Sequence, residues 1–110
     1  MAALNDSFTA RKIAAILPIK STVNLWGDEI YFTIPLHCEL ENEQKIVNMG
    51  DLGFWPEGDT FCIFFGPTPI SKRDEIRPAS SVNVFGRIIG DAKAFKQIHA
   101  GTEITVEELI

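Results

Sequence analysis

The sequence predicts a mainly β fold, either a small barrel or a sandwich, on three observations. Apolar and polar residues alternate at a period of two over much of the chain after Pro18, as expected for half-buried strands. Pairs of Gly, Pro and Asp that are typical of tight turns separate these stretches. Helical periodicity is confined to two short segments. Short strands joined by such turns favour a barrel or a sandwich, and a closed barrel would leave no exposed sheet edge.

The first helix is expected over residues 8–17. Residues 5–7 (Asn, Asp, Ser) offer side-chain acceptors suited to an N-cap. An apolar stripe then follows at helical spacing: Ala10, Ile13, Ala14 and Leu17. Pro18 should end the helix, because proline lacks the amide donor and restricts the residue before it. A second, short helix is expected over residues 92–98, after the Gly90-Asp91 turn signal.

The strands are expected where alternation or β-favouring residues recur. These segments are 23–25, 30–34, 36–40, 52–55, 60–65, 82–89 and 102–106. Residues 56–59 read as a turn and residues 66–81 as a long surface connection. Five of the eleven aromatic residues fall within residues 50–69. The hairpin formed there should therefore build much of the core.

Composition restricts the class of protein. A chain of 110 residues with 45% hydrophobic residues is expected to form one globular domain over residues 1–110. The net charge is -5, and Lys and Arg form no positive stripe, so we expect no nucleic-acid partner. No apolar run approaches the roughly 20 residues of a membrane helix. With no secretory signal and only Cys38 and Cys62, we expect reduced thiols and a cytoplasmic location.

Three runs of sequence resemble a family of small, uncharacterised prokaryotic proteins with a cyclophilin-like fold. The runs are WGDEIYF (26–32), GDLGFWPEGDTFCIFFGPTP (50–69) and PASSVNVFGRIIGD (78–91), and the resemblance extends over about residues 4–106. It implies a small closed β-barrel with a helix plugging one end. Two departures are Phe54, where the family commonly has Tyr, and Glu57, where it commonly has Pro.

Family members also usually carry a strand and a turn before the segment that corresponds to the start of this chain. By this resemblance Met1 lies inside the second strand, so the first barrel strand is either missing or upstream. A missing strand would expose unpaired backbone groups. Such an edge would favour a homodimer formed by edge pairing.

The C-terminal part, residues 82–101, also resembles true cyclophilins, which are peptidyl-prolyl isomerases. The resemblance places their active-site His at Val82, their pocket Phe at Cys62 and their pocket Gln at Thr60. Their catalytic Arg follows the first helix, whereas no Arg occurs here between residues 12 and 72. Without that guanidinium, nothing obvious stabilises a twisted prolyl amide. The resemblance therefore implies the scaffold, argues against the activity and assigns no catalytic residue.

The strand at residues 60–65 divides into two faces. If Phe61, Ile63 and Phe65 fill the core, the other face looks toward the groove in which cyclophilins bind peptide. The groove candidates are Thr60, Cys62 and Phe64, with Phe54 and Trp55 on the neighbouring strand. An apolar groove with a few polar groups suits a small molecule or a peptide. The alternative is that these aromatic residues simply form the core of a small barrel.

Trp26, Glu29 and Tyr31 form a second candidate group. Glu29 and Tyr31 share one strand face, so a carboxylate and a phenol could converge on one ligand. A Glu beside aromatic rings could have a raised pKa and act as an acid or a base. In the alternative interpretation, Glu29 holds the turn at residues 27–28 and Tyr31 closes one end of the barrel.

Other chemistry is weakly indicated. Cys62 has no His, Lys or Arg close in sequence to lower its pKa, which favours a buried, inert thiol over a nucleophile. The four residues of the types that bind zinc lack the usual ligand spacing: His37, Cys38, Cys62 and His99. Arg77 could hold a carboxylate at the groove edge or could remain solvated. We expect no metal and no cofactor.

These observations lead to one main hypothesis and two alternatives. The main hypothesis is a binding module for a small apolar or peptide-like ligand, without ordinary prolyl isomerase activity. The first alternative is a divergent peptidyl-prolyl isomerase. The second is a structural or assembly protein that associates through its incomplete edge.

Overall fold

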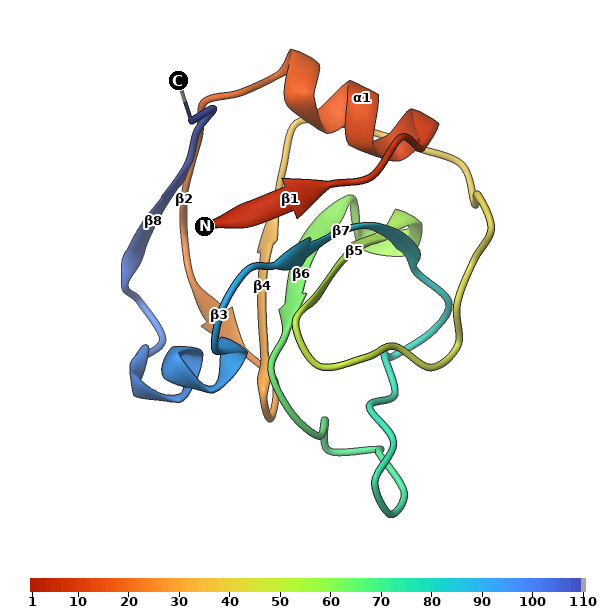
Figure 1. Ribbon diagram of the computed structural model, residues 1–110, viewed down its shortest axis with the longest axis vertical. Helices are drawn as coiled ribbons and strands as arrows, with labels where there is room; N and C mark the ends of the chain where they lie inside the picture. The colour runs from red at the N-terminus through yellow and green to blue at the C-terminus, as the bar shows by residue number, and fades with distance from the viewer. Residues whose placement is uncertain (110) are drawn as a thin grey trace.

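The computed structural model describes residues 1–109, which form a mainly β domain (Figure 1). The strands are β1 (Ala2–Leu4), β2 (Ile19–Thr22), β3 (Asn24–Leu25), β4 (Glu29–Thr33), β5 (Asp51–Trp55), β6 (Thr60–Phe64), β7 (Asn83–Ile88) and β8 (Glu103–Val106). The helices are α1 (Phe8–Ala15) and two short 3-10 helices, η1 (Pro56–Gly58) and η2 (Ala92–Gln97).

Two antiparallel sheets organise these strands. Six strands form the main sheet in the order β1-β7-β5-β6-β4-β3, whereas β2 and β8 form a separate two-stranded ladder. Figure 1 shows this ladder standing beside the main sheet, with α1 passing over the N-terminal strand. Strands β2 and β3 are separated only by Val23, so one extended segment pairs first with β8 and then with β4. This bend joins the two sheets.

The predicted closed barrel is not found. In the part of the chain that the structure describes, β1 and β3 are the two ends of the main sheet, and the β2–β8 ladder is not part of that sheet. Closure would require a continuous hydrogen-bonded ladder around the fold. Instead, an apolar groove of about 800 Å³ lies among β1, β8, α1 and the core side of the main sheet. The fold is therefore an open sheet with a second, smaller sheet beside it.

The central strand β6 is buried at every position, so both faces of the main sheet are covered. On one side, Phe61 stacks on Phe32 with ring centroids 4.8 Å apart and meets the edge of Phe85 at 5.0 Å. This is the main core, which also takes in α1 through Ile13. On the other side, Cys62 and Phe64 belong to a smaller apolar cluster. Because successive side chains of β6 point to opposite faces of the sheet, they belong to two different cores.

Helix α1 begins as predicted and ends two residues earlier, at Ala15. The Ser7 side chain caps it by accepting a hydrogen bond from the Ala10 amide. The Glu41 carboxylate adds a second cap, because it accepts hydrogen bonds of 2.9 Å from the amides of Phe8 and Thr9. Backbone donors at a helix start have no partner within the helix, and a carboxylate there also favours the helix dipole. A distant loop residue therefore completes this N-terminus.

Six of the seven strands predicted from the residue pattern are confirmed, and β1 and β2 were not among the predicted segments. Residues 36–40 form no strand. The carbonyl of Glu39 and the amide of Glu41 bond instead to the side chain of Asn83, at 2.8 Å each, so a side chain replaces the partner strand. Strand β2 was not predicted; its central residues Lys20 and Ser21 are both polar. The expected C-terminal helix is the 3-10 helix η2.

Among residues 1–109, no helix is both long enough and apolar enough to cross a membrane.

Candidate functional site

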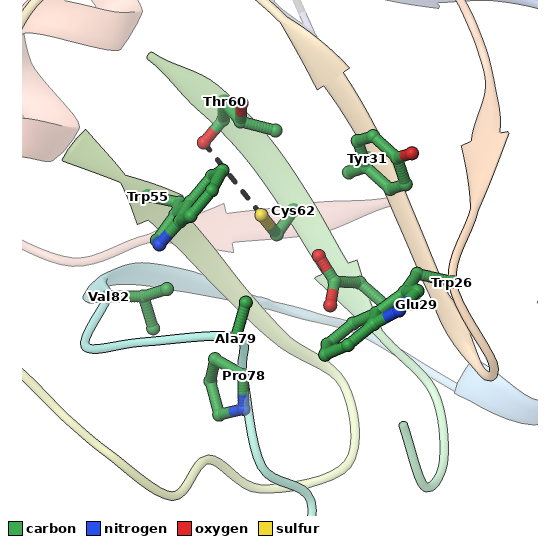
Figure 2. Close-up of a pocket in the computed structure, with 9 residues that line it drawn as sticks. All are labelled: Trp26, Glu29, Tyr31, Trp55, Thr60, Cys62, Pro78, Ala79 and Val82. Carbon is green, nitrogen blue, oxygen red and sulfur yellow. Dashed lines mark hydrogen bonds between the residues drawn. The ribbon is translucent and has the colours of Figure 1, made fainter. Parts of the chain in front are cut away.

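A pocket of about 190 Å³ opens on the side of the main sheet that carries the smaller apolar cluster. The residues around it come from the β3–β4 turn, from β4, β5 and β6, and from the loop before β7 (Figure 2). Its lining consists of Trp26, Glu29, Tyr31, Trp55, Thr60, Cys62, Pro78, Ala79 and Val82. The first six of these were candidates from the sequence, so the structure brings together the two groups that the sequence analysis treated separately.

The hairpin between β3 and β4 holds Trp26 and Glu29 next to each other. Their backbones exchange hydrogen bonds across a two-residue turn, at 2.9 and 3.2 Å. The first turn residue, Gly27, has a φ of +58°, and a Cβ added there would lie 2.8 Å from Pro69 Cδ. Because opposed residues of a hairpin point to the same side, this turn directs both side chains into the pocket.

The floor of the pocket follows from strand register. Tyr31 on β4 lies directly opposite Cys62 on β6, and Trp55 on β5 lies directly opposite Thr60 on β6. Directly opposed residues share a face, and so do residues two apart along a strand. The two cross-strand pairs and Glu29 therefore reach the same face of the sheet.

One wall of the pocket is Trp55, which two contacts hold in place. Its Nε1 donates a hydrogen bond of 2.6 Å to Ser80 Oγ, which in turn donates one of 2.6 Å to Glu57. Beneath the ring lies Gly58, where an added Cβ would come within 2.7 Å of the indole. The hydrogen bond between Trp55 and Ser80 also holds the loop that carries Pro78 and Ala79 over the pocket (Figure 2).

Glu29 is the charged residue of the lining, and its side chain is buried. The residue is 6% exposed, and its Oε1 atom has no hydrogen-bond partner among the described residues. Burial raises the pKa of Glu29 from its ordinary 4.5 to about 7, although a contact with the Cys62 thiol partly opposes the shift. Desolvation penalises the charged form of a carboxyl group. Near neutral pH the site therefore holds a carboxyl group poised between acid and carboxylate.

Cys62 does not have the surroundings of a nucleophile. Its Sγ lies 3.9 Å from the Thr60 carbonyl, to which it donates a weak hydrogen bond. Burial, reinforced by the nearby Glu29 charge, raises the pKa of this thiol well above its ordinary value. A thiol is reactive as the thiolate, and a raised pKa removes that form at neutral pH. Cys62 therefore acts as a small, inert part of the pocket floor.

Comparison with known proteins identifies the family of this chain. A search against protein families matches residues 1–107 to the family described as cyclophilin-like. The chain belongs to the cyclophilin-like family. Among solved structures, it resembles the hypothetical protein AF2241 from Archaeoglobus fulgidus, known from a solution structure. The two share 49% identity with a TM-score of 0.74, over 90% of this chain and 76% of that one. No curated protein matches the chain.

Three of the lining residues are those that the sequence resemblance set against residues of the isomerase active site. The sequence resemblance put the cyclophilin His, Phe and Gln at Val82, Cys62 and Thr60. All three of these residues line the pocket. Val82 was noted only as a replaced catalytic position, yet it forms part of the apolar floor.

Two sequence candidates lie outside the lining. Phe54 is fully buried in the main core, on the opposite side of the sheet from Trp55. Adjacent strand residues point to opposite faces, so Phe54 and Trp55 could not both reach the pocket. Phe64 shares the face of Cys62 but is also fully buried, in the smaller cluster with Val47 and Ile76. The structure assigns both phenylalanines to cores.

Pro78 and Ala79 were missed as lining residues because nothing in a loop sequence shows which surface the loop covers. Arg77, next to them, forms a salt bridge of 2.7 Å to Glu75 and does not line the pocket. Within the described residues, no group of three or more His, Cys, Asp or Glu side chains is placed to hold a metal ion.

Proposed function

We propose that this protein binds a small apolar or peptide-like ligand in the pocket between Trp26 and Trp55, without ordinary prolyl isomerase activity. The observation that carries the proposal is the convergence of three aromatic side chains on the buried carboxyl group of Glu29, whose Oε1 atom has no hydrogen-bond partner among the described residues. Ligand sites are typically concave and mostly apolar, with a few placed polar groups. Burial of an unpaired carboxyl group costs folding free energy, and a ligand could offset that cost.

The side chains at the isomerase positions support binding over catalysis. Thr60, Cys62 and Val82 supply no cationic group, and no Arg or His occurs in the lining. Isomerisation needs donors aimed at the charge that develops on the twisted amide. In this pocket the polar side-chain groups are a carboxyl, a phenol, a hydroxyl, a buried thiol and two indole N–H groups, of which that of Trp55 is bonded to Ser80.

The chain offers a direct test, because its only two tryptophans both line the pocket. Their two indole N–H signals in a ¹⁵N-labelled sample would report occupancy without full assignment. We expect members of a panel of small apolar metabolites and proline-containing peptides to shift both signals. Phe8→Ala, which removes a largely exposed aromatic residue on α1, is the matched control and should leave such binding unchanged. Shifts that never map to the pocket lining would remove the proposal.

The isomerase alternative is decided by a separate measurement. The isomerisation rate of a proline peptide should stay at the uncatalysed value even at high protein concentration. An acceleration that is lost on Trp55→Ala would establish a divergent isomerase at this site.

A second candidate function, assembly, is favoured by the edge of the main sheet. In the described residues β1 pairs only with β7, and the side chains of Met1 and Leu4 are 77% and 43% exposed. An unpaired edge beside an apolar groove can accept a strand from a second copy. Sedimentation over a range of concentrations tests this candidate. A monomer throughout excludes edge pairing, and a dimer that Leu4→Lys dissociates supports it.

A further inference from the structure

The pocket carries one charged group and no cation to balance it. Its nine lining residues include three aromatic side chains, one carboxyl group, and no Lys, Arg or His. Figure 2 shows the Glu29 carboxyl group lying between the Trp26 ring and Cys62, with Trp55 on the far side of the thiol. An anionic ligand would meet a like charge and no positive partner there.

Two charged side chains that are next to lining residues in the sequence pair with other residues outside the pocket. Asp28, beside Glu29 in the turn, lies 3.8 Å from Lys96 Nζ, and Arg77 is paired with Glu75. Within the lining, the titratable groups around Glu29 are the thiol of Cys62 on β6 and the phenol of Tyr31 on the same strand as Glu29, β4. Neither can supply a positive charge. The Oε1 atom of Glu29 therefore lacks a partner that the described residues could provide.

From this arrangement we propose that the ligand is an organic cation, whose ammonium head group sits against the Glu29 carboxylate among Trp26, Tyr31 and Trp55. The inference rests on the proposed function, because it names the chemical class of the ligand of that same pocket. A cation is attracted electrostatically by the faces of aromatic rings, most strongly those of Trp. It also supplies the opposite charge that a buried carboxylate needs.

The competing chemistry is a neutral ligand that accepts a hydrogen bond from protonated Glu29. The cationic ligand and the neutral ligand predict opposite pH dependence of the binding affinity. A cation binds more tightly as Glu29 ionises, so its affinity should rise with pH through the pKa of about 7. A neutral acceptor should bind more weakly over the same range. The pKa of His37 is raised, mainly by its hydrogen bond to Asp59, but His37 is exposed and pairs with Asp59 and Glu39 outside the lining.

The test uses choline, which stays cationic at all pH values, and dimethylbutanol, its neutral carbon isostere. Binding to the intact chain is followed through the two indole signals at pH 5.5 and pH 8.5, at constant ionic strength. We expect choline to bind more tightly than the isostere at pH 8.5 and to weaken at least about tenfold at pH 5.5. Glu29→Gln should reduce choline affinity about tenfold or more and abolish its pH dependence, while affinity for the isostere stays unchanged.

A second variant separates the aromatic contribution from folding defects. Trp26→Leu keeps an apolar wall and should weaken choline more than the isostere, with Trp55 as the remaining reporter. Equal affinity for choline and the isostere, or full choline affinity in Glu29→Gln, would overturn the cation inference alone. If the metabolite and peptide panel also leaves both indole signals unmoved, the proposed function falls with it.

Discussion

The indole nitrogen of Trp55 donates a 2.6 Å hydrogen bond to the hydroxyl of Ser80, 25 residues further along the chain. The Ser80 hydroxyl in turn donates a hydrogen bond to the Glu57 carboxylate, so one serine links the β5 strand, the η1 turn and the loop over the pocket. Buried polar groups must find partners, and an indole N–H has no other way to be satisfied than by an acceptor. This link sets the position of the pocket wall relative to its cover.

Ser80→Ala should loosen that wall. The change leaves the indole donor and the Glu57 carboxylate without their shared partner, at a cost of about 1 kcal/mol in the free energy of unfolding. Chemical denaturation followed by tryptophan fluorescence measures both the stability and the exposure of the ring. Ser81→Ala is the control, because no side-chain hydrogen bond of Ser81 is found in the described residues. Identical behaviour of the two variants would contradict the role of this link.

Glu29 should make the protein less stable as the pH rises. Its pKa is about 7 in the folded chain and 4.5 ordinarily, so between these values the folded state binds more protons than the unfolded state. Stability is then highest below pH 4.5, falls as the pH rises to about 7 and stays lower above it, by about 3 kcal/mol from this group.

The measurement is the difference in unfolding free energy between the natural chain and Glu29→Gln from pH 5 to pH 8. The unfolding free energy of Glu29→Gln should fall less steeply with pH, and the variant should be the more stable protein at pH 8. The raised pKa of His37, caused mainly by its hydrogen bond to Asp59, works in the same direction in both proteins. It therefore cancels in the comparison. Parallel curves would mean that Glu29 titrates normally.

Gly27→Ala should disrupt the hairpin that presents Trp26 and Glu29. The position combines a φ of +58° with contacts of 2.8 Å to Pro69 and 2.9 Å to the Pro67 carbonyl for an added Cβ. Gly90→Ala is a matched control, since its φ is +100° but nothing lies within 4 Å of the new methyl group. Both substitutions should lower the free energy of unfolding by about 1 kcal/mol, because alanine is strained at a positive φ.

Only Gly27→Ala should lower the free energy of unfolding further, because the backbone at Pro67 and the ring of Pro69 would have to move. Urea denaturation of the two variants gives the comparison, and the indole signals of the Gly27 variant should shift as well. If Gly90→Ala proves as destabilising, crowding against the 67–69 turn is not what requires glycine at position 27.

Asn83→Ala should be among the most damaging single changes. Asn83 is 1% exposed, and its amide bonds to Thr9 Oγ1, to the Glu39 carbonyl and to the Glu41 amide. Removing it leaves several buried groups unpaired, at a cost of about 2–4 kcal/mol. The exposed Asn24, which bonds only to the Tyr31 carbonyl at 3.3 Å, supplies the control as Asn24→Ala. Thermal unfolding should show a clear loss of stability for Asn83→Ala and little loss for Asn24→Ala.

Much of the candidate site could be predicted from local patterns. Residues two apart on a strand share a face, and this rule alone groups Thr60 with Cys62 and Glu29 with Tyr31. The same rule, applied to Phe54 and Trp55 together, would have excluded one of them. The turn at residues 27–28 could also be recognised, because glycine signals a backbone that other residues rarely adopt.

Closure of the fold could not be predicted this way. Whether β1 and β8 meet depends on how two sheets bend around Val23, and no local pattern encodes that geometry. The segment at 36–40 shows the same limit. Its alternation suggested a strand, but a single side chain, Asn83, took the backbone bonds that a neighbouring strand would have made.

Local sequence patterns are enough to predict a mainly β domain, the place of most strands and turns, and which side chains share a strand face. These properties depend on neighbours two to four residues away. Only the folded arrangement shows that Trp26 and Trp55 flank one pocket, that Pro78 and Ala79 cover it, and that Phe64 is enclosed. It also leaves Glu29 buried, with no hydrogen-bond partner for its Oε1 atom among the described residues. Burial and electrostatics are sums over residues distant in the chain, so only the folded arrangement could reveal them.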